Sequence, residues 1–248
     1  MVILCVCKKR VKADISEELI IDNVNIQRKH CTKFLGVMID EYLDFKEHIQ
    51  YIKGKISRGL GILFKCRRLF TQKTLLTLYN SFVYPYMNYC INVWGRTFDS
   101  YLDPLVKLQK KAVRVIAGAQ RNSHTDPLFK KLNILEFHKI YLYSVQLFVY
   151  KYHHALLPEI FNDFFTRNDS FHPQRFTRIG NYFIPPGART SKRHVKVTGV
   201  LTHNFFLFRL NINCSYLSYK VSLRIFLIKN NIKIVVDEEG SRLIIMPD

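Results

Sequence analysis

The feature that most constrains the fold is a change in the spacing of apolar residues at Asp44. Before this residue, short β-branched runs alternate with polar pairs, which is typical of strands. After it, apolar residues recur every three or four positions, as on one face of a helix. The series is Phe45, Ile49, Ile52, Ile56, Leu60 and Leu63. The chain is therefore expected to begin with strands and to continue as helices.

The first 43 residues contain four candidate strands. Residues 19–21 and 24–26 flank Asp22-Asn23, a two-residue pair that predicts a hairpin turn. Residues 2–6 form another short β-branched run, and residues 33–39 form a further strand with Gly36 inside it. Glycine within a strand often marks a bulge or a close approach of another backbone. We expect a small antiparallel sheet here.

Helices dominate from Asp44 to about residue 155. Thr71 is a plausible N-cap for a second helix, which Pro85 should interrupt because proline lacks a backbone donor. A later helix from Phe137 to His154 is apolar nearly all round and is expected to be buried. The predicted class is α+β, mainly α. Its parts are a β piece at 1–43, a helical domain at 44–155, and a loop-rich, irregular segment at 156–248.

Net charge restricts the class of partner. The 248 residues include 38 Lys and Arg against 19 Asp and Glu, a net charge of +19. This excess disfavours cationic substrates and favours a polyanion, nucleic acid first and an acidic membrane surface second. Residues 1–45 are neutral overall, whereas residues 46–121 hold fourteen basic and three acidic residues. The surface that faces a polyanion should therefore begin after residue 45.

The third predicted helix, over residues 105–116, carries the clearest candidate binding surface. Its apolar stripe is Leu105, Leu108, Ala112, Val115 and Ile116. On the opposite side lie Lys107, Lys110, Lys111 and Arg114. Four like charges on one helical stripe repel each other unless an anion neutralises them. We predict that these four residues contact phosphates; the alternative is that they form a solvated face. The next predicted phosphate contacts are Lys65, Arg67 and Arg68.

No catalytic motif is recognisable in the chain. It lacks a phosphate-binding glycine-rich loop, and no two aspartates are adjacent. The closest acidic residues are Asp40, Glu41 and Asp44, at a strand-to-helix junction where carboxylates commonly cap a helix. We therefore predict no catalytic residue, no metal site and no cofactor for this chain.

Cysteine usage and hydropathy bear on location. The six cysteines form no C-x-x-C pair, so a zinc site is not indicated and the thiols are expected to be reduced. No run of 18 apolar residues occurs, so no membrane span is predicted. An intracellular location follows, in the nucleus or the cytoplasm.

Four motifs follow one another along the chain. The first is K-F-L-G-V-M-I-D from Lys33, followed by Leu43, Phe45, His48 and Ile49. The second spans residues 78–95 and ends in Trp94-Gly95, and the third is L-V-K-L-Q-K-K-A-V-R-V-I from Leu105. The fourth is D-P-L-F from Asp126. In this order, the four motifs resemble those of the reverse transcriptases of LINE-type (jockey-like, non-LTR) retrotransposons. A weaker match at residues 197–204 has His203 where the family has tryptophan and keeps Asn204.

The resemblance implies the end of a polymerase palm, a thumb and a C-terminal connection. By analogy, the Gly36 strand would lie on the primer side, and the thumb helices would hold the RNA and DNA of a template–primer duplex. The family's fingers, catalytic Asp-Asp motif and endonuclease would precede Met1. That missing N-terminal half would be a natural partner. The Mg²⁺ ions of the family would be held by carboxylates that this chain lacks.

Three hypotheses for the function remain open. The first is a truncated RNA-directed DNA polymerase without catalysis of its own, which keeps a sequence-tolerant affinity for nucleic-acid backbones. The second is a non-functional retrotransposon relic whose basic residues are inherited. The third is a basic module that binds a protein partner or a membrane surface.

Overall fold

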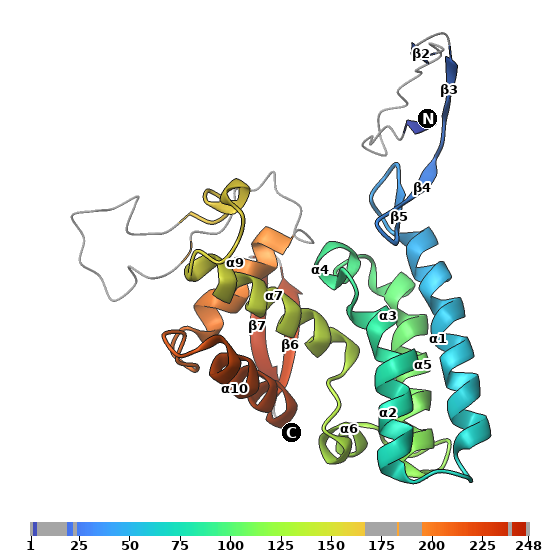
Figure 1. Cartoon of the computed structure of the whole chain (residues 1–248). Helices are drawn as coiled ribbons and strands as arrows, with labels where there is room; N and C mark the ends of the chain where they lie inside the picture. The colour runs from blue at the N-terminus through green and yellow to red at the C-terminus, as the bar shows by residue number, and fades with distance from the viewer. Residues whose placement is uncertain are drawn as a thin grey trace. The chain divides into compact units, whose positions relative to one another are not determined.

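Strands give way to helices at residue 46, as the change in apolar spacing predicts. The computed structural model describes residues 2–3, 19–21, 24–166, 183, 195–237 and 240–246. The chain groups into two units, Met1–Cys90 with Thr97–Ala112, and Ile91–Arg96 with Val113–Asp248 (Figure 1). The mainly helical α+β class is confirmed, and the division at residues 43 and 155 stays a prediction.

The N-terminal strands form a three-stranded sheet in the order β1-β3-β2. These are β1 (Val2–Ile3), β2 (Leu19–Ile21) and β3 (Val24–Arg28). The predicted hairpin is confirmed, with β2 antiparallel to β3 and Leu19 opposite Ile26. The β1 strand instead pairs parallel to β3, so this sheet is mixed. The Asp22-Asn23 turn lies outside the described residues.

A second hairpin corrects the prediction of one strand over residues 33–39. Strands β4 (Cys31–Phe34) and β5 (Val37–Asp40) pair antiparallel, with Phe34 opposite Val37. The two residues between them have positive φ values, 44° at Leu35 and 87° at Gly36. Turns with two left-handed residues match the twist of paired strands, which explains glycine at this position. Gly36 is therefore a turn residue and not a strand residue.

Helices α1 (Lys46–Cys66) and α2 (Gln72–Phe82) form an antiparallel pair beside this hairpin (Figure 1). The apolar series that predicted α1 is buried, with Ile56 and Leu63 fully enclosed. Thr71 caps α2 as predicted, because its side chain accepts a hydrogen bond from the Thr74 N–H. The two helices cross closely at Gly59, where a Cβ atom would lie 2.6 Å from the Phe82 carbonyl oxygen.

The break expected at Pro85 is confirmed. The α2 helix ends at Phe82, and Pro85 occupies the first turn of a short helix, α3 (Tyr84–Asn88). After α4 (Ile91–Trp94), the long helix α5 spans Asp99–Ala117. Inside the first unit, the buried Gln109 side chain of α5 donates a 3.0 Å hydrogen bond to the Tyr79 hydroxyl of α2. That bond satisfies two buried polar groups and ties α5 to the α1–α2 pair.

The second unit is built around α7 (Phe137–His153), which is buried on nearly every side, as predicted. It packs against α9 (Val195–Phe206) and α10 (Tyr216–Lys229) and is joined to each by a buried hydrogen bond. The Tyr141 hydroxyl donates to the Thr198 hydroxyl, and the Gln146 amide donates to the Tyr219 hydroxyl. Burial raises the pKa of both tyrosines to about 12. The described part of this unit also contains α6 (Asp126–Leu132) and the 3₁₀ turn η1 (Glu159–Phe161).

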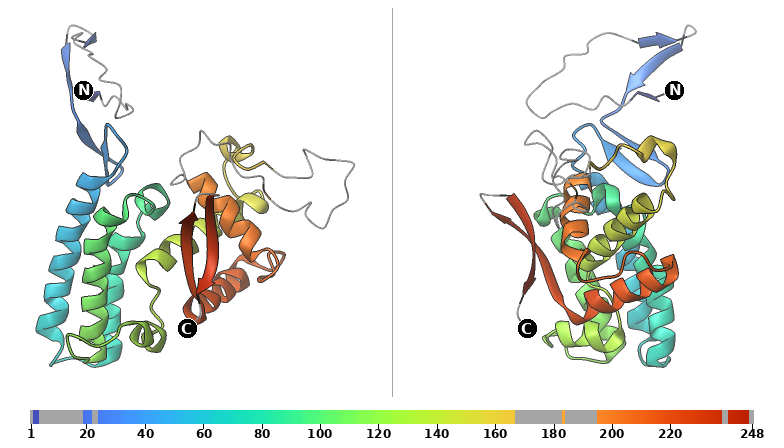
Figure 2. Two further views of the ribbon diagram at one scale, coloured as in Figure 1. Left: turned by 180° about the vertical axis from the view of Figure 1, so that it is seen from behind. Right: turned by 90° about the vertical axis from the view of Figure 1, so that its left-hand side faces the viewer.

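The described C-terminal residues are more regular than the sequence indicates. They form α9, α10 and a hairpin of β6 (Asn231–Asp237) and β7 (Gly240–Met246), which Figure 2 shows from two sides. The α10 helix gives no periodic signal because apolar residues lie all round it, with Leu223 buried and Leu217 exposed. At the weaker motif, His203 is buried against the Phe183 ring, and the Asn204 amide bonds both the N–H and the carbonyl of Phe183.

Candidate nucleic-acid interface

The α5 helix buries one face and carries its cations on the other. Leu105, Ala112 and Ile116 of the predicted apolar stripe are buried, while Leu108 and Val115 are half-buried. Positions three, four and seven residues apart share one face of a helix. The face opposite the buried stripe therefore holds Lys107, Lys110, Lys111 and Arg114.

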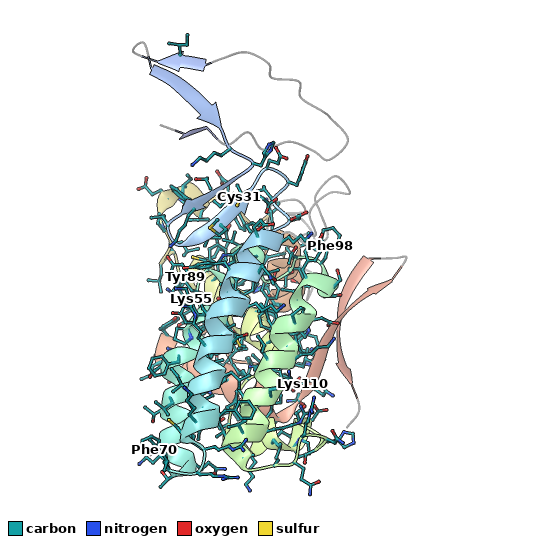
Figure 3. All side chains as sticks on the ribbon, turned by 90° about the vertical axis from the view of Figure 1, so that its right-hand side faces the viewer. Cys31, Lys55, Phe70, Tyr89, Phe98 and Lys110 are labelled. Carbon is teal, nitrogen blue, oxygen red and sulfur yellow. The ribbon has the colours of Figure 1, made fainter. Side chains whose placement is uncertain are left out.

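The four cations differ in what they contact. The Lys107 ammonium lies 3.9 Å from the Asp103 carboxylate, and both side chains are largely exposed, so this pair contributes little to stability. The Arg114 Nε donates a 2.9 Å hydrogen bond to the Ser123 carbonyl, which fixes the loop after α5. Lys110, which Figure 3 labels on α5, and Lys111 make no hydrogen bond or ion pair within the described part of the chain. Three lysines are thus the better candidates for phosphate contacts, and Arg114 has a structural task.

The second predicted group lies at the end of α1 and in the turn that follows. Lys65, Arg67 and Arg68 are all exposed. The Arg67 guanidinium lies over the Phe64 ring, 5.4 Å from its centroid. Such a contact orients the cation while leaving its N–H donors directed outward for a second partner.

Helices α1, α2 and α3 of the first unit are depleted of carboxylates. No Asp or Glu occurs between Glu47 and Asp99, a stretch that contains α2 and α3 and all but the first turn of α1. Eight Lys and Arg residues fall within the same stretch. Because no acidic side chain of these helices neutralises them, the positive potential extends into solvent.

The sequence did not reveal one cationic cluster, which is formed by Lys33, Tyr51 and Lys55. The ammonium groups of Lys33 on β4 and Lys55 on α1 each lie 5.4 Å from the centroid of the Tyr51 ring. Each interaction is worth about 0.5–1 kcal/mol at an exposed site. The four-residue spacing of Tyr51 and Lys55 could have indicated half of the cluster. The position of Lys33 depends on the packing of the β4–β5 hairpin on α1.

The turn of that hairpin presents apolar side chains to solvent beside these cations. Phe34 and Leu35 are 61% and 74% exposed. The Tyr89 hydroxyl holds the turn by donating to the Leu35 carbonyl at 2.6 Å. Gly36 therefore lies at a fixed, projecting turn, at the α1 end that also bears the Tyr51 cluster.

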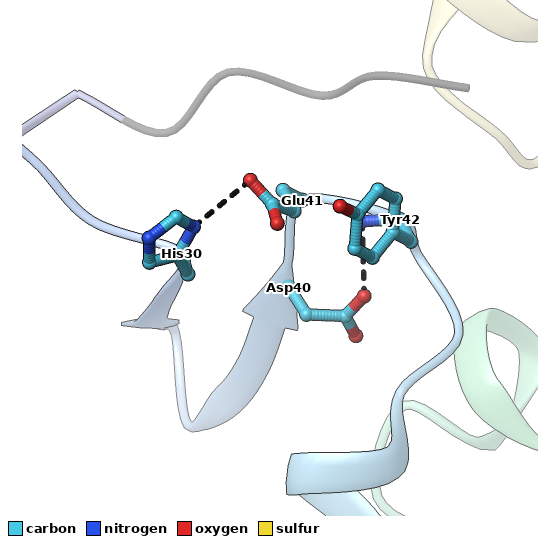
Figure 4. Close-up of polar contacts among 4 residues, drawn as sticks. All are labelled: His30, Asp40, Glu41 and Tyr42. Carbon is cyan, nitrogen blue, oxygen red and sulfur yellow. Dashed lines mark hydrogen bonds and ion pairs between the residues drawn. The ribbon is translucent and has the colours of Figure 1, made fainter. Parts of the chain in front are cut away.

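The acidic residues before α1 bond within the segment that leads into the helix, but no side chain caps α1 in the way that their position predicted (Figure 4). The Glu41 carboxylate lies 3.1 Å from the His30 ring nitrogen. The Asp40 carboxylate accepts hydrogen bonds from the backbone N–H groups of Tyr42, Asp44 and Phe45.

No group of three His, Cys, Asp or Glu side chains among the described residues could hold a metal ion. No helix in the described ranges is both long and apolar enough to span a membrane.

Comparison with known proteins gives a partial match. No family model matches the chain, and no solved structure matches it. Over 104 residues the chain is 27% identical to the probable RNA-directed DNA polymerase from transposon X-element of Drosophila melanogaster. The similarity supports a reverse-transcriptase-related origin.

The short extent of this match limits what can be inferred from it about the function of this chain. It covers 40% of this chain and 11% of the Drosophila protein. The chain therefore spans a small part of its relative, and the activity of that protein does not transfer to this chain directly. The interface residues are assigned by their geometry and charge.

Proposed function

We propose that this chain is a C-terminal portion of a retrotransposon reverse transcriptase that binds a template–primer duplex of RNA and DNA through its phosphates. The chain contributes binding and no catalytic group. Binding needs no metal from this chain, because lysine ammonium groups supply the contacts to phosphate.

The observation that carries the proposal is the lysine face of α5. Lys107 and Lys111 are exposed and Lys110 is half-buried, on a helix whose opposite side is buried. Successive positions along this face rise by about 1.5 Å per residue, so cations three or four residues apart can address neighbouring phosphates of one strand. Phosphate contacts fix a duplex without reading its sequence, which suits a polymerase that must hold any template.

The Gly36 turn and the Tyr51 cluster extend this proposal to the primer side. The exposed Phe34 and Leu35 of the turn and the Lys33–Tyr51–Lys55 cluster both lie near the start of α1. We assign this surface to the primer strand, by the resemblance of the motif that begins at Lys33 to the palm end of the family.

Equilibrium binding to a labelled RNA–DNA duplex across a salt series tests the proposal. Lys107, Lys110 and Lys111 are changed together to Gln, and Arg114 is retained because it holds the Ser123 loop. For a duplex, each phosphate that a lysine neutralises adds about 0.9 to the salt slope. We expect the slope of the triple variant to fall by about 2–3.

The matched control removes the same charge from the other unit. It carries Lys131→Gln, Lys220→Gln and Lys229→Gln, all at exposed positions. We expect this control to keep the slope of the unchanged protein. Equal slopes for all three proteins would remove α5 from the interface. No binding at low salt by a folded sample would leave the reverse-transcriptase relationship as ancestry alone.

A further inference from the structure

The end of α1 and the turn that leads to α2 expose three large apolar side chains within seven residues. We call residues 64–70 the α1–α2 tip; it comprises Phe64, Lys65, Cys66, Arg67, Arg68, Leu69 and Phe70. Leu69 is 78% exposed, Phe70 is 49% exposed and Phe64 is 41% exposed. Clustered exposed apolar groups of this kind commonly mark a contact surface.

The tip is held in one conformation by its backbone. The N–H groups of Leu69 and Phe70 both donate to the Cys66 carbonyl, at 3.0 and 3.1 Å. Directly afterwards, Thr71 caps α2 through its side chain. The backbone that carries Phe70 is therefore held between two helix ends, which lowers the conformational entropy that a bound partner must remove.

The charges around the tip are all of one sign. Lys65, Arg67 and Arg68 are exposed, and neither α2 nor α1 beyond Glu47 contains an acidic residue. Arg67 lies over the Phe64 ring. Aromatic rings interleaved with cations match both parts of an unpaired nucleotide, its base and its phosphate.

We infer that the α1–α2 tip binds single-stranded nucleic acid, with an unpaired base stacked on Phe70 and the neighbouring phosphates on Arg67 and Arg68. A protein interface of standard size buries about 800 Å² on each side, which three apolar side chains do not supply. The one-sided charge favours a polyanion over a protein surface of mixed charge.

This site is separate from the primer-side surface and does not depend on the duplex proposal. Figure 3 shows Phe70 at the end of α1 opposite to Tyr89 and the β4–β5 hairpin. The 21 residues of α1 place the two ends about 30 Å apart. The tip would take a strand that is no longer paired, whereas the α5 lysines would take the paired region.

The test compares a labelled single-stranded oligonucleotide with a labelled duplex, using the full chain and fluorescence anisotropy. Phe70→Leu keeps an apolar side chain but removes the aromatic face. We expect it to weaken single-strand binding roughly 5- to 160-fold, the value of one stacked base. Its salt slope and its affinity for the duplex should not change. Phe70→Tyr should retain single-strand affinity.

The cationic half of the site has its own readout. Arg67→Gln combined with Arg68→Gln should lower the single-strand salt slope by about 1.4, because each phosphate contributes about 0.7. Phe208→Leu, at an exposed phenylalanine of the other unit, is the matched control and should leave single-strand binding unchanged.

Three outcomes would overturn the inference. Unchanged single-strand binding by Phe70→Leu would remove the stacked base. Equal weakening of duplex and single-strand binding would make the tip part of a general electrostatic surface. Binding to vesicles with anionic lipid that Phe70→Leu abolishes, while single-strand binding persists, would assign the tip to a membrane surface. The α5 triple variant is expected to change binding to the duplex, whereas Phe70→Leu is expected to change binding to the single strand. The two proposals can therefore fail separately.

Discussion

The Tyr89 hydroxyl donates a 2.6 Å hydrogen bond to the Leu35 carbonyl oxygen, between residues 54 positions apart in the chain. The bond joins the end of α3 to the β4–β5 turn. The same tyrosine ring lies 3.2 Å from where a Cβ atom would stand on Gly36. One side chain therefore holds the turn in position and also crowds the place of a Cβ at Gly36, where the positive φ already favours glycine.

Removing this hydroxyl should loosen the hairpin selectively. Tyr89→Phe loses one hydrogen bond, worth about 0.5–1.5 kcal/mol. We expect faster amide hydrogen exchange in β4 and β5, with the amides of α7 unchanged. Tyr86→Phe, which alters another exposed tyrosine of α3, should leave exchange in the hairpin as it is. Equal exchange in the two variants would show that the Tyr89 bond does not restrain the turn.

Two glycines should respond to alanine with opposite signs. Gly36 has φ of 87° and faces the Tyr89 ring, so Gly36→Ala should destabilise the protein by about 1–2 kcal/mol. Gly61 is a helical residue with no atom within 4 Å of an added Cβ. Gly61→Ala should therefore stabilise α1 by about 0.5–1 kcal/mol. Urea denaturation monitored by circular dichroism measures the stability of both variants. Denaturation midpoints that shift in the same direction would contradict the prediction.

The carboxylate of Asp40 should contribute more to the free energy of unfolding than the carboxylate of Asp44. It accepts three backbone hydrogen bonds, the shortest at 2.7 Å from the Phe45 N–H, and it is buried. Asp40→Asn keeps one acceptor oxygen and loses the charge, so we expect a loss of about 1–3 kcal/mol. Asp44→Asn should cost less, because that carboxylate accepts a 3.2 Å bond at an exposed site. Urea midpoints of equal size for the two variants would be inconsistent with this ranking.

Acid should weaken the first unit through His48. Burial lowers the pKa of this imidazole from 6.5 to about 4, and its Nδ1 accepts a hydrogen bond from the Met38 N–H. The folded state therefore binds the proton less readily than the unfolded state. Stability that is fully present above pH 6.5 is lost as the pH falls toward 4.

His48→Asn provides the control for this pH dependence. Its amide oxygen can replace Nδ1 as the acceptor, and it does not titrate. We expect a lower stability at pH 7 but a flatter stability profile between pH 6.5 and 4, measured by urea denaturation at each pH. A profile as steep as that of the unchanged protein would assign the acid sensitivity to other groups.

Apolar spacing predicted α1, through the series from Phe45 to Leu63. The α7 helix was predicted from a long run that begins at Phe137 and is apolar nearly all round. The sequence also separated the cationic and buried sides of α5, because both follow from the 3.6-residue period. It failed for α10, whose apolar residues are neither confined to one face nor continuous along the chain.

The tertiary structure decided the contacts between residues that are far apart in the chain. The sequence determined the helix faces, since periodicity is local and each face has to be buried or solvated. Only the folded chain brings Lys33 to the Tyr51 ring and Tyr89 to the Leu35 carbonyl. The folded chain also places Gly36 in a turn. The left-handed backbone at Leu35 and Gly36 depends on the pairing of β4 with β5.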